Sequence, residues 1–120
     1  LILLDQIPRN IFRNSPHAFA TDHLAQTIAL RALDQRFDAA TDSAMRQFFY
    51  LPLEHAEDAE MQARCVRLFE GLGDANFTRY AILHRDIIER FGRFPHRNAI
   101  LGRKSTPEEL QFLAEGGFAG

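Results

Sequence analysis

Apolar residues recur at the spacing of an α-helix in the middle of the chain, and this pattern constrains the fold most. Between residues 57 and 72 they stand at positions i, i+4, i+7, i+8 and i+11, namely Met61, Cys65, Leu68, Phe69 and Leu72. This spacing places all of them on one face of a helix. No stretch alternates at period two, and no Asn-Gly hairpin signal occurs. We therefore expect an all-α protein.

Capping residues predict where the helices begin and end. Helix starts are expected near residues 22, 43, 57 and 75, and a last short helix should follow Thr106-Pro107. Gly73 and Gly92 are typical helix ends, and Pro52 should break or kink the helix that contains it. Alternate helices then begin about 35 and 32 residues apart, close to the period of tetratricopeptide helix pairs. The sequence predicts antiparallel helix pairs stacked as a tetratricopeptide-like right-handed array.

The other helices have apolar faces of their own, which we expect to point inward. They comprise Leu24, Ala25, Ile28, Ala29, Ala32 and Leu33 in the first, Met45, Phe48 and Phe49 in the second, Phe77, Ala81, His84, Ile88 and Phe91 in the fourth, and Leu110 and Leu113 in the last. On the outer face of the fourth helix, Asp86 with Arg90 and Glu89 with Arg93 have the spacing of surface ion pairs.

Length and composition indicate one soluble helical domain over residues 1–120. The single cysteine, Cys65, excludes an internal disulfide and suits a reducing compartment, so we expect a cytoplasmic protein. No apolar run approaches the roughly 20 residues of a membrane helix. The chain begins with Leu, and its first four residues are typical of the end of a helix. We therefore expect a further segment upstream.

Charge patterning excludes one class of partner and favours another. A basic block spans residues 79–104, but it is too small and has too few interleaved aromatic residues to predict nucleic-acid binding. Most of the cationic residues are arginine, whose planar guanidinium group suits carboxylate and phosphate. A small anionic ligand or an acidic protein surface is therefore the expected kind of partner, and the oligomeric state is not indicated.

Polar side chains concentrate in three segments of the sequence. The densest is HRDIIERFGRFPHRN at 84–98, the second is the Glu-His node at 54–58, and the third is DQIPRN at 5–10. The first and third share a Pro-Arg-Asn order, so we expect two loops of similar shape that meet. The candidate ligand-binding residues are Asp5, Arg9, Asn10, Glu54, His55, Asp58, His84, Arg93, His96, Arg97 and Asn98.

These residues also have structural interpretations. The side chains of the two Pro-Arg-Asn segments could cap helix ends and hold loops in place. His84 lies on an apolar stripe and could be a core histidine paired with a carboxylate such as Glu54 or Asp58. Both readings stay open at this point.

Several chemistries lack their sequence signatures. There is no H-E-x-x-H, no cysteine pair, no Walker A motif, no dinucleotide fingerprint and no G-x-S-x-G. We therefore expect neither a metal nor a cofactor, and the sequence leaves open whether the protein is an enzyme. His84-Arg85-Asp86 is like a kinase catalytic loop only superficially, because Phe91 stands where that motif requires Asn.

Longer motifs resemble a known family. LLDQIPRN at 3–10, LPLEHAED at 51–58, HRDIIERFGRFPHRN with AILGR at 84–103, and STPEELQFL at 105–113 are similar to the bacterial domain-of-unknown-function family 924. The resemblance covers nearly the whole chain. It implies a tetratricopeptide-like helical fold and a further N-terminal helical part, and it implies no activity.

Two functional hypotheses follow. One is a polar Arg/His/Asn/Glu cavity that binds a small anionic ligand. The other is a tetratricopeptide-like interaction or scaffold module without catalysis, which would bind a protein partner.

Overall fold

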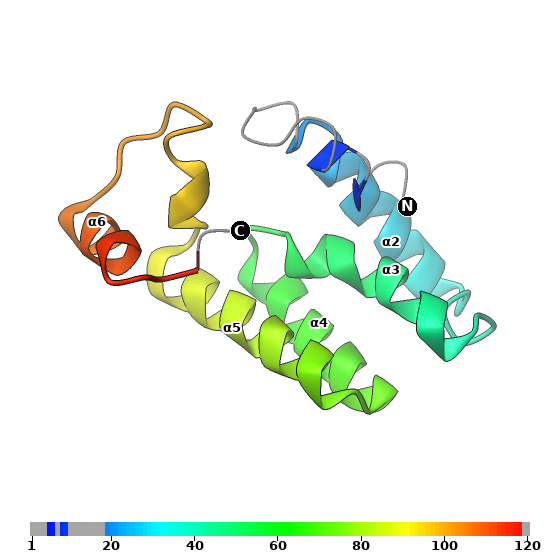
Figure 1. Cartoon of the computed structure of the whole chain (residues 1–120). Helices are drawn as coiled ribbons and strands as arrows, with labels where there is room; N and C mark the ends of the chain where they lie inside the picture. Colours follow the sequence, from blue (N-terminus) through cyan, green and yellow to red (C-terminus); the bar gives the residue numbers. More distant parts are fainter. Residues whose placement is uncertain (1–4, 7, 10–18, 119–120) are drawn as a thin grey trace.

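The computed structural model describes residues 5–6, 8–9 and 19–118, and all their regular secondary structure is helical. The elements, in chain order, are α2 (Asp22–Asp34), α3 (Ser43–Glu54), α4 (Ala59–Leu72), α5 (Ala75–Phe91), the 3-10 turn η2 (Pro95–Arg97) and α6 (Pro107–Ala114). Figure 1 shows α2 beside α3 and α4 beside α5. The prediction of an all-α fold is confirmed, and the stacked right-handed array stays a prediction.

The helical hairpin of α4 and α5 follows the capping signals closely. Asp58 stands before α4 and its carboxylate accepts a hydrogen bond from the N–H of Met61 at 2.9 Å. The helix ends at Gly73, whose φ of +83° lies in the left-handed region that glycine adopts without strain. Asp74 then caps α5 by accepting from Asn76 N and Phe77 N. The caps Gly73 and Asp74 are consecutive residues, so the connection is short and α5 returns antiparallel to α4 (Figure 1).

The hairpin of α2 and α3 differs from the prediction at Pro52. This residue lies inside α3, and the helix continues to Glu54. The backbone N–H of His55 still donates to Leu51 O at 3.0 Å, so the last turn closes after the proline. Pro52 was expected to break or kink the helix; it does not break it, and the helix carries Glu54 at its C-terminal end.

Most of the predicted stripes are buried, with exceptions on the outer surface. The main core consists of Ala29, Leu33, Tyr50, Leu53, Cys65, Val66, Phe69 and Ala81, and a smaller cluster of Ile87, Ile88 and Phe94 packs against Phe91, Phe112 and Phe118. Cys65 is fully buried, as expected. Four residues that were expected to point inward are exposed instead, namely Leu24, Ile28, Met45 and Leu110.

Chain reversal after α5 positions the polar segment that follows. Gly92 has φ +75° and turns the chain toward Phe94, after which η2 places His96 and Arg97 on a short turn. Further on, α6 begins at Pro107, as predicted, and Thr106 and Glu109 form a capping box at its start. Among the described residues, no helix is both long enough and apolar enough to cross a bilayer.

Candidate functional site

The turn after α3 presents Glu54 and His55, and a buried amide from α4 fixes it. Gln62 is fully buried, and its Nε2 lies 2.6 Å from Glu54 O, 2.8 Å from Ala56 O and 3.3 Å from Leu53 O. These carbonyls belong to the C-terminal end of α3, where backbone acceptors lack helical partners. Gln62 therefore stabilises the turn from which the side chains of Glu54 and His55 extend into the site.

Replacing Gln62 with Leu should lower the free energy of unfolding by about 1–3 kcal/mol, because the carbonyl oxygens of Glu54 and Ala56 lose the donor of their short hydrogen bonds. Urea unfolding followed by circular dichroism measures the change. Gln111→Leu is the matched control: this amide is exposed and bonds only Glu115, so its loss should change stability by less than about 0.5 kcal/mol. Equal effects of the two substitutions would contradict this role for Gln62.

Asp5 connects the N-terminal polar segment, residues 5–10, to His55. Its Oδ1 lies 3.0 Å from His55 Nδ1 and 2.8 Å from Arg9 Nη1, and Gln6 donates to its Oδ2. Burial alone would raise the pKa of Asp5, but the hydrogen bond from His55 and the charges of His55 and Arg9 bring it below its usual value. Asp5 is therefore an ionised carboxylate with donors around it.

The guanidinium group of Arg9 forms ion pairs with two carboxylates. Besides Asp5, it contacts Asp22 through two bonds, Nη1 to Oδ1 at 2.9 Å and Nη2 to Oδ2 at 2.7 Å. This paired geometry is the strongest that an arginine makes with a carboxylate. Asp22, the first residue of α2, is thus a buried partner that holds Arg9 against this helix.

Arg97 occupies the centre of the site with few hydrogen bonds. Its Nη2 donates to His55 O at 2.9 Å, and its Nη1 lies 3.9 Å from Asp22 Oδ2. The guanidinium group is sandwiched between the rings of Phe19, at 4.5 Å, and Phe94, at 4.7 Å. Burial, and then the charge of Arg9, lowers the pKa of Arg97 to about 10, so it is a cation at neutral pH.

Two further histidines lie beside Arg97. His84 Nδ1 is 2.7 Å from Tyr80 O, and its ring lies 6.3 Å from the ring of His55 and 4.6 Å from that of Phe118. The ring of His96 is 5.4 Å from Phe118. Burial first, and positive charge second, lowers the pKa of His84 and of His96 to about 4. Both rings are therefore neutral at pH 7.

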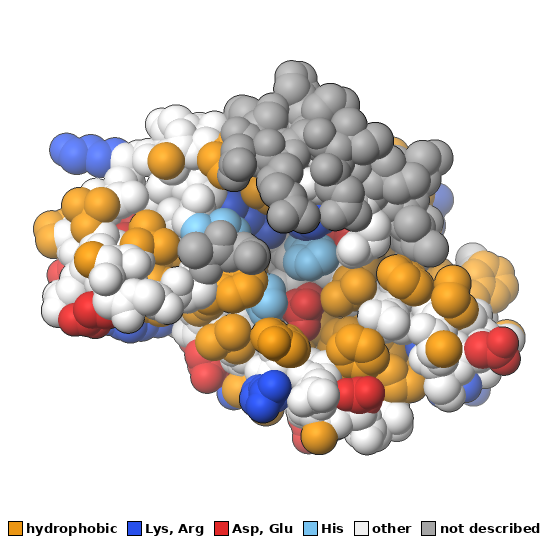
Figure 2. Space-filling view, viewed as in Figure 1, with side chains coloured by type: hydrophobic (Ala, Val, Ile, Leu, Met, Phe, Trp, Pro, Cys, Tyr) orange, Lys and Arg blue, Asp and Glu red, His pale blue; other side chains and the backbone are white. Residues whose placement is uncertain are grey.

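Glu54 is the carboxyl group in this region that carries a proton most readily. Burial, together with the negative charge of Asp5, raises its pKa to about 7. The same burial raises the pKa of the Cys65 thiol beyond the physiological range, so Cys65 is not a nucleophile. We call the group of Asp5, Arg9, Glu54, His55, His84, His96 and Arg97 the histidine cluster. In Figure 2, histidine side chains are seen in a hollow with an acidic and a basic side chain beside them and hydrophobic side chains around.

A second network holds the loop that carries Arg97. Glu57 accepts from Phe94 N at 2.6 Å and from both terminal nitrogens of Arg103, at 2.8 and 3.1 Å. Arg103 Nε donates to Asn98 Oδ1 at 3.0 Å. Burial opposes ionisation of Glu57, but the bonds from Arg103 and Phe94 N hold its pKa below the usual value. Glu57 therefore ties the 92–103 segment to the start of α4.

Three of the predicted site residues lie outside the histidine cluster. Asp58 is exposed and caps α4. Asn98 donates to Ser105 Oγ and Glu109 Oε2, so it belongs to the second network. Arg93 contacts Glu109 through Nε at 2.9 Å and Nη2 at 2.7 Å. Asn10 lies outside the described residues.

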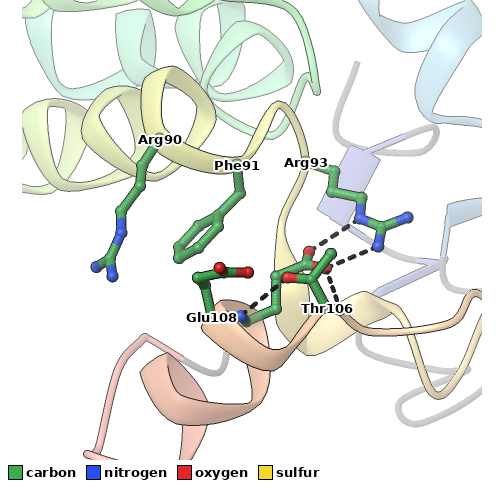
Figure 3. Close-up of a pocket in the computed structure, with 6 residues that line it drawn as sticks. Arg90, Phe91, Arg93, Thr106 and Glu108 are labelled. Atoms are coloured by element: carbon green, nitrogen blue, oxygen red, sulfur yellow. Dashed lines mark hydrogen bonds and ion pairs between the residues drawn. The ribbon is translucent and has the colours of Figure 1, made fainter.

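Arg93 faces a separate pocket between the end of α5 and the start of α6 (Figure 3). The pocket has a volume of about 490 Å³ and is lined by Arg90, Phe91, Arg93, Thr106, Glu108 and Glu109. The expected surface pairs are wrong here: Arg93 binds Glu109, Arg90 stacks over Phe91 at 4.6 Å, and Glu89 lies 3.7 Å from Arg85. The ring of Phe91 and the carboxylate of Glu109 are better buried partners than an exposed acid.

The structure brings seven predicted residues together: Asp5, Arg9, Glu54, His55, His84, His96 and Arg97. His84 finds its partner in the Tyr80 carbonyl, and not in Glu54 or Asp58 as the core reading supposed. Sequence reasoning missed Asp22, Glu57, Gln62 and Phe19. For Glu57, the signal was its place in the Glu-His node; for the others there was none. Among the described residues, no three His, Cys, Asp or Glu side chains form a group that could hold a metal ion.

Comparisons with known proteins place the chain in a family and find a similar solved structure. No curated protein matches the chain. A solved structure, a protein of unknown function, ATU0120 from Agrobacterium tumefaciens, is 51% identical and superimposes with a TM-score of 0.91. The match covers 96% of this chain and 65% of that one, so the chain spans less than two thirds of that protein's length. The model of the family described as bacterial protein of unknown function (DUF924) matches residues 1–117, and the chain belongs to this family.

Proposed function

We propose that the chain binds a small anionic ligand at the histidine cluster, with Arg97 as the positive charge that attracts it. The observation that carries this proposal is the mismatch at Arg97. Its side chain is only 8% exposed, yet its closest ion-pair contact among the described residues is the 3.9 Å approach to Asp22. A buried guanidinium group with so weak a partner favours an anion brought from solution.

Comparison with the other arginines of the site supports this reading. Arg9, Arg93 and Arg103 each have a carboxylate within 2.8 Å, namely that of Asp22, Glu109 or Glu57. Their positive charge is therefore balanced inside the fold. Arg97 makes one short bond to a backbone carbonyl, and its Nε has no hydrogen-bond partner in the part of the chain that the structure describes.

The surroundings of Arg97 are prepared for a ligand in two ways. The rings of Phe19 and Phe94 fix the plane of the guanidinium group, so little conformational entropy is lost when an anion binds. The charge of Arg97 also helps to keep His84 and His96 neutral, which is the effect of a positive local potential. A bound anion would lower that potential and make both imidazoles easier to protonate.

Arg97→Gln should abolish the stabilisation of the protein by anions. For the wild type, inorganic phosphate or acetate at 100 times its dissociation constant should stabilise the fold by about 2.7 kcal/mol, read as a rise in melting temperature. Arg85→Gln is the control, because Arg85 is a surface arginine that pairs with Asp86. Its variant should respond to anions like the wild type.

Arg97→Lys keeps the charge but not the planar fork, so it should bind more weakly than the wild type and more tightly than Arg97→Gln. Partial stabilisation of Arg97→Lys by anions would show that the lost response of Arg97→Gln is not caused by misfolding. No stabilisation of the wild type by either anion, or an equal response of all variants, would count against the proposal.

A protein-interaction surface is the second candidate function. It is favoured by Leu24 and Ile28, which lie one turn apart on α2 and are 50% and 37% exposed. Neighbouring exposed apolar side chains on one helix are a feature of docking surfaces. A Leu24→Glu, Ile28→Glu double variant should then lose a partner that the wild type retains in a pull-down, while its anion response is unchanged.

A further inference from the structure

The tautomer of His55 is set by its neighbour. A carboxylate that receives bonds from Arg9 and Gln6 has no proton to give, so at the 3.0 Å contact His55 Nδ1 must be the donor and Asp5 Oδ1 the acceptor. In the neutral ring, the lone pair is then on Nε2. Since a carboxylate holds the far side of the imidazole, that lone pair is also more basic.

His84 is fixed in the same tautomer by a different group. A backbone carbonyl can only accept, so at 2.7 Å His84 Nδ1 donates to Tyr80 O. Its Nε2 is an acceptor as well. Two neighbouring rings, 6.3 Å apart, therefore each carry an acceptor nitrogen. The side chain of Arg97 bonds the carbonyl of His55, and its positive charge acts on both rings.

The aromatic rings around His84 supply no strong hydrogen-bond donor to this region. Phe94 lies 5.5 Å and Phe118 4.6 Å from its ring centre, and both side chains are hydrocarbon. A ligand that met Arg97 with an anionic group would thus find an acceptor, and not a donor, at Nε2 of His55 and of His84. An anion with acceptors alone would leave them unsatisfied.

We infer that the ligand is a carboxylate that carries its own hydrogen-bond donor on the neighbouring carbon, that is, an α-hydroxy or α-amino carboxylate. The carboxylate meets Arg97, and the hydroxyl or ammonium group donates to Nε2 of His55 and His84. This inference rests on the proposed function and narrows it to a substrate class.

Three compounds with the same carbon skeleton test it: propionate, lactate and alanine, which differ only in the group at carbon 2. Isothermal titration of the wild type should give dissociation constants for lactate or alanine at least about tenfold below that of propionate, the effect of one additional hydrogen bond to an imidazole nitrogen. Whichever of the two binds more tightly identifies the donor as hydroxyl or ammonium.

His84→Asn should reduce this preference to within about twofold. Asparagine can still donate to Tyr80 O from near the Nδ1 position, but it lacks the acceptor at Nε2. The control is His23→Asn, because His23 is exposed on α2, and its variant should keep the wild-type preference. Arg97→Gln should lose all three ligands.

Nitrogen-15 spectra of the wild type give a second readout that depends on no variant. His55 and His84 should each show a protonated Nδ1 and an unprotonated Nε2, and addition of lactate or alanine should shift the Nε2 signals. Equal affinity for the three compounds, or protonated Nε2 in both rings, would overturn the inference and leave anion binding at Arg97 intact. Absence of binding by all three and by phosphate would overturn both proposals.

Discussion

Substitution of Arg9 by Met should lower the free energy of unfolding by about 3–5 kcal/mol. This is the largest effect on stability that we expect from any substitution proposed for this protein. Arg9 contacts Asp22 through two bonds of 2.7 and 2.9 Å and Asp5 through two more. The side chains of Asp5 and Asp22 are 3% and 10% exposed. Without Arg9, Asp22 would be a buried carboxylate with Arg97 3.9 Å away. Urea unfolding at pH 7 measures the loss.

A double variant separates the loss of the ion pair from the loss of packing. Arg9→Met with Asp22→Asn leaves no unpaired charge at position 22, so it should be more stable than Arg9→Met alone. Arg64→Met is a matched control, because Arg64 pairs at 3.5 Å with Asp34, whose side chain is 73% exposed; its cost should stay below about 1 kcal/mol. A cost for Arg9→Met no larger than that of Arg64→Met would show that the buried pair has no such role.

The helices could be predicted because their signals are local. The stripe of Met61, Cys65 and Phe69 lies on α4, and the capping residues Asp74 and Thr106 stand where α5 and α6 begin. Each of these features depends on residues within a few positions of one another. Exposure was harder to predict, since whether an apolar residue such as Met45 is covered depends on which other helix lies against it.

The candidate site was predictable only in part, because its contacts join segments far apart in the sequence. The shared Pro-Arg-Asn order predicted that two segments meet, and Arg9 and Arg97 do approach the same carboxylate, that of Asp22. It could not predict that Asp22 and Asp5 would occupy Arg9 and leave Arg97 with the weaker contact. Nor could a helical pattern show that Gln62 points at the carbonyls of the preceding turn. These assignments depend on side-chain geometry between helices, which has no signature in spacing.

Buried titratable groups in the histidine cluster give opposite contributions to the pH dependence of stability. His84 and His96 have pKa values of about 4 in the fold against a usual 6.5, so between these values the unfolded chain binds more protons. Their contribution is complete above pH 6.5 and is lost as the pH falls toward 4. Glu54, with a pKa of about 7 against 4.5, binds its proton in the fold; its contribution is complete below pH 4.5 and is lost as the pH rises to 7.

Between pH 7 and pH 5 the two histidines should outweigh the single carboxyl group. Each histidine costs roughly 2 kcal/mol over this interval and Glu54 returns roughly 2 kcal/mol, so the wild type should lose about 1–2 kcal/mol of stability on acidification. Burial also lowers the pKa of His55, which acts in the same direction as the other two histidines.

Two substitutions should change this pH profile in opposite ways. His84→Asn removes one of the histidines and should leave the stability nearly independent of pH between 5 and 7. Glu54→Gln removes the opposing group and should deepen the loss to about 3–4 kcal/mol. Urea unfolding of the three proteins at half-unit intervals of pH measures the slopes. Since both variants are compared with themselves across pH, a constant cost of substitution cancels, and parallel profiles for all three proteins would mean that neither His84 nor Glu54 titrates as its burial requires.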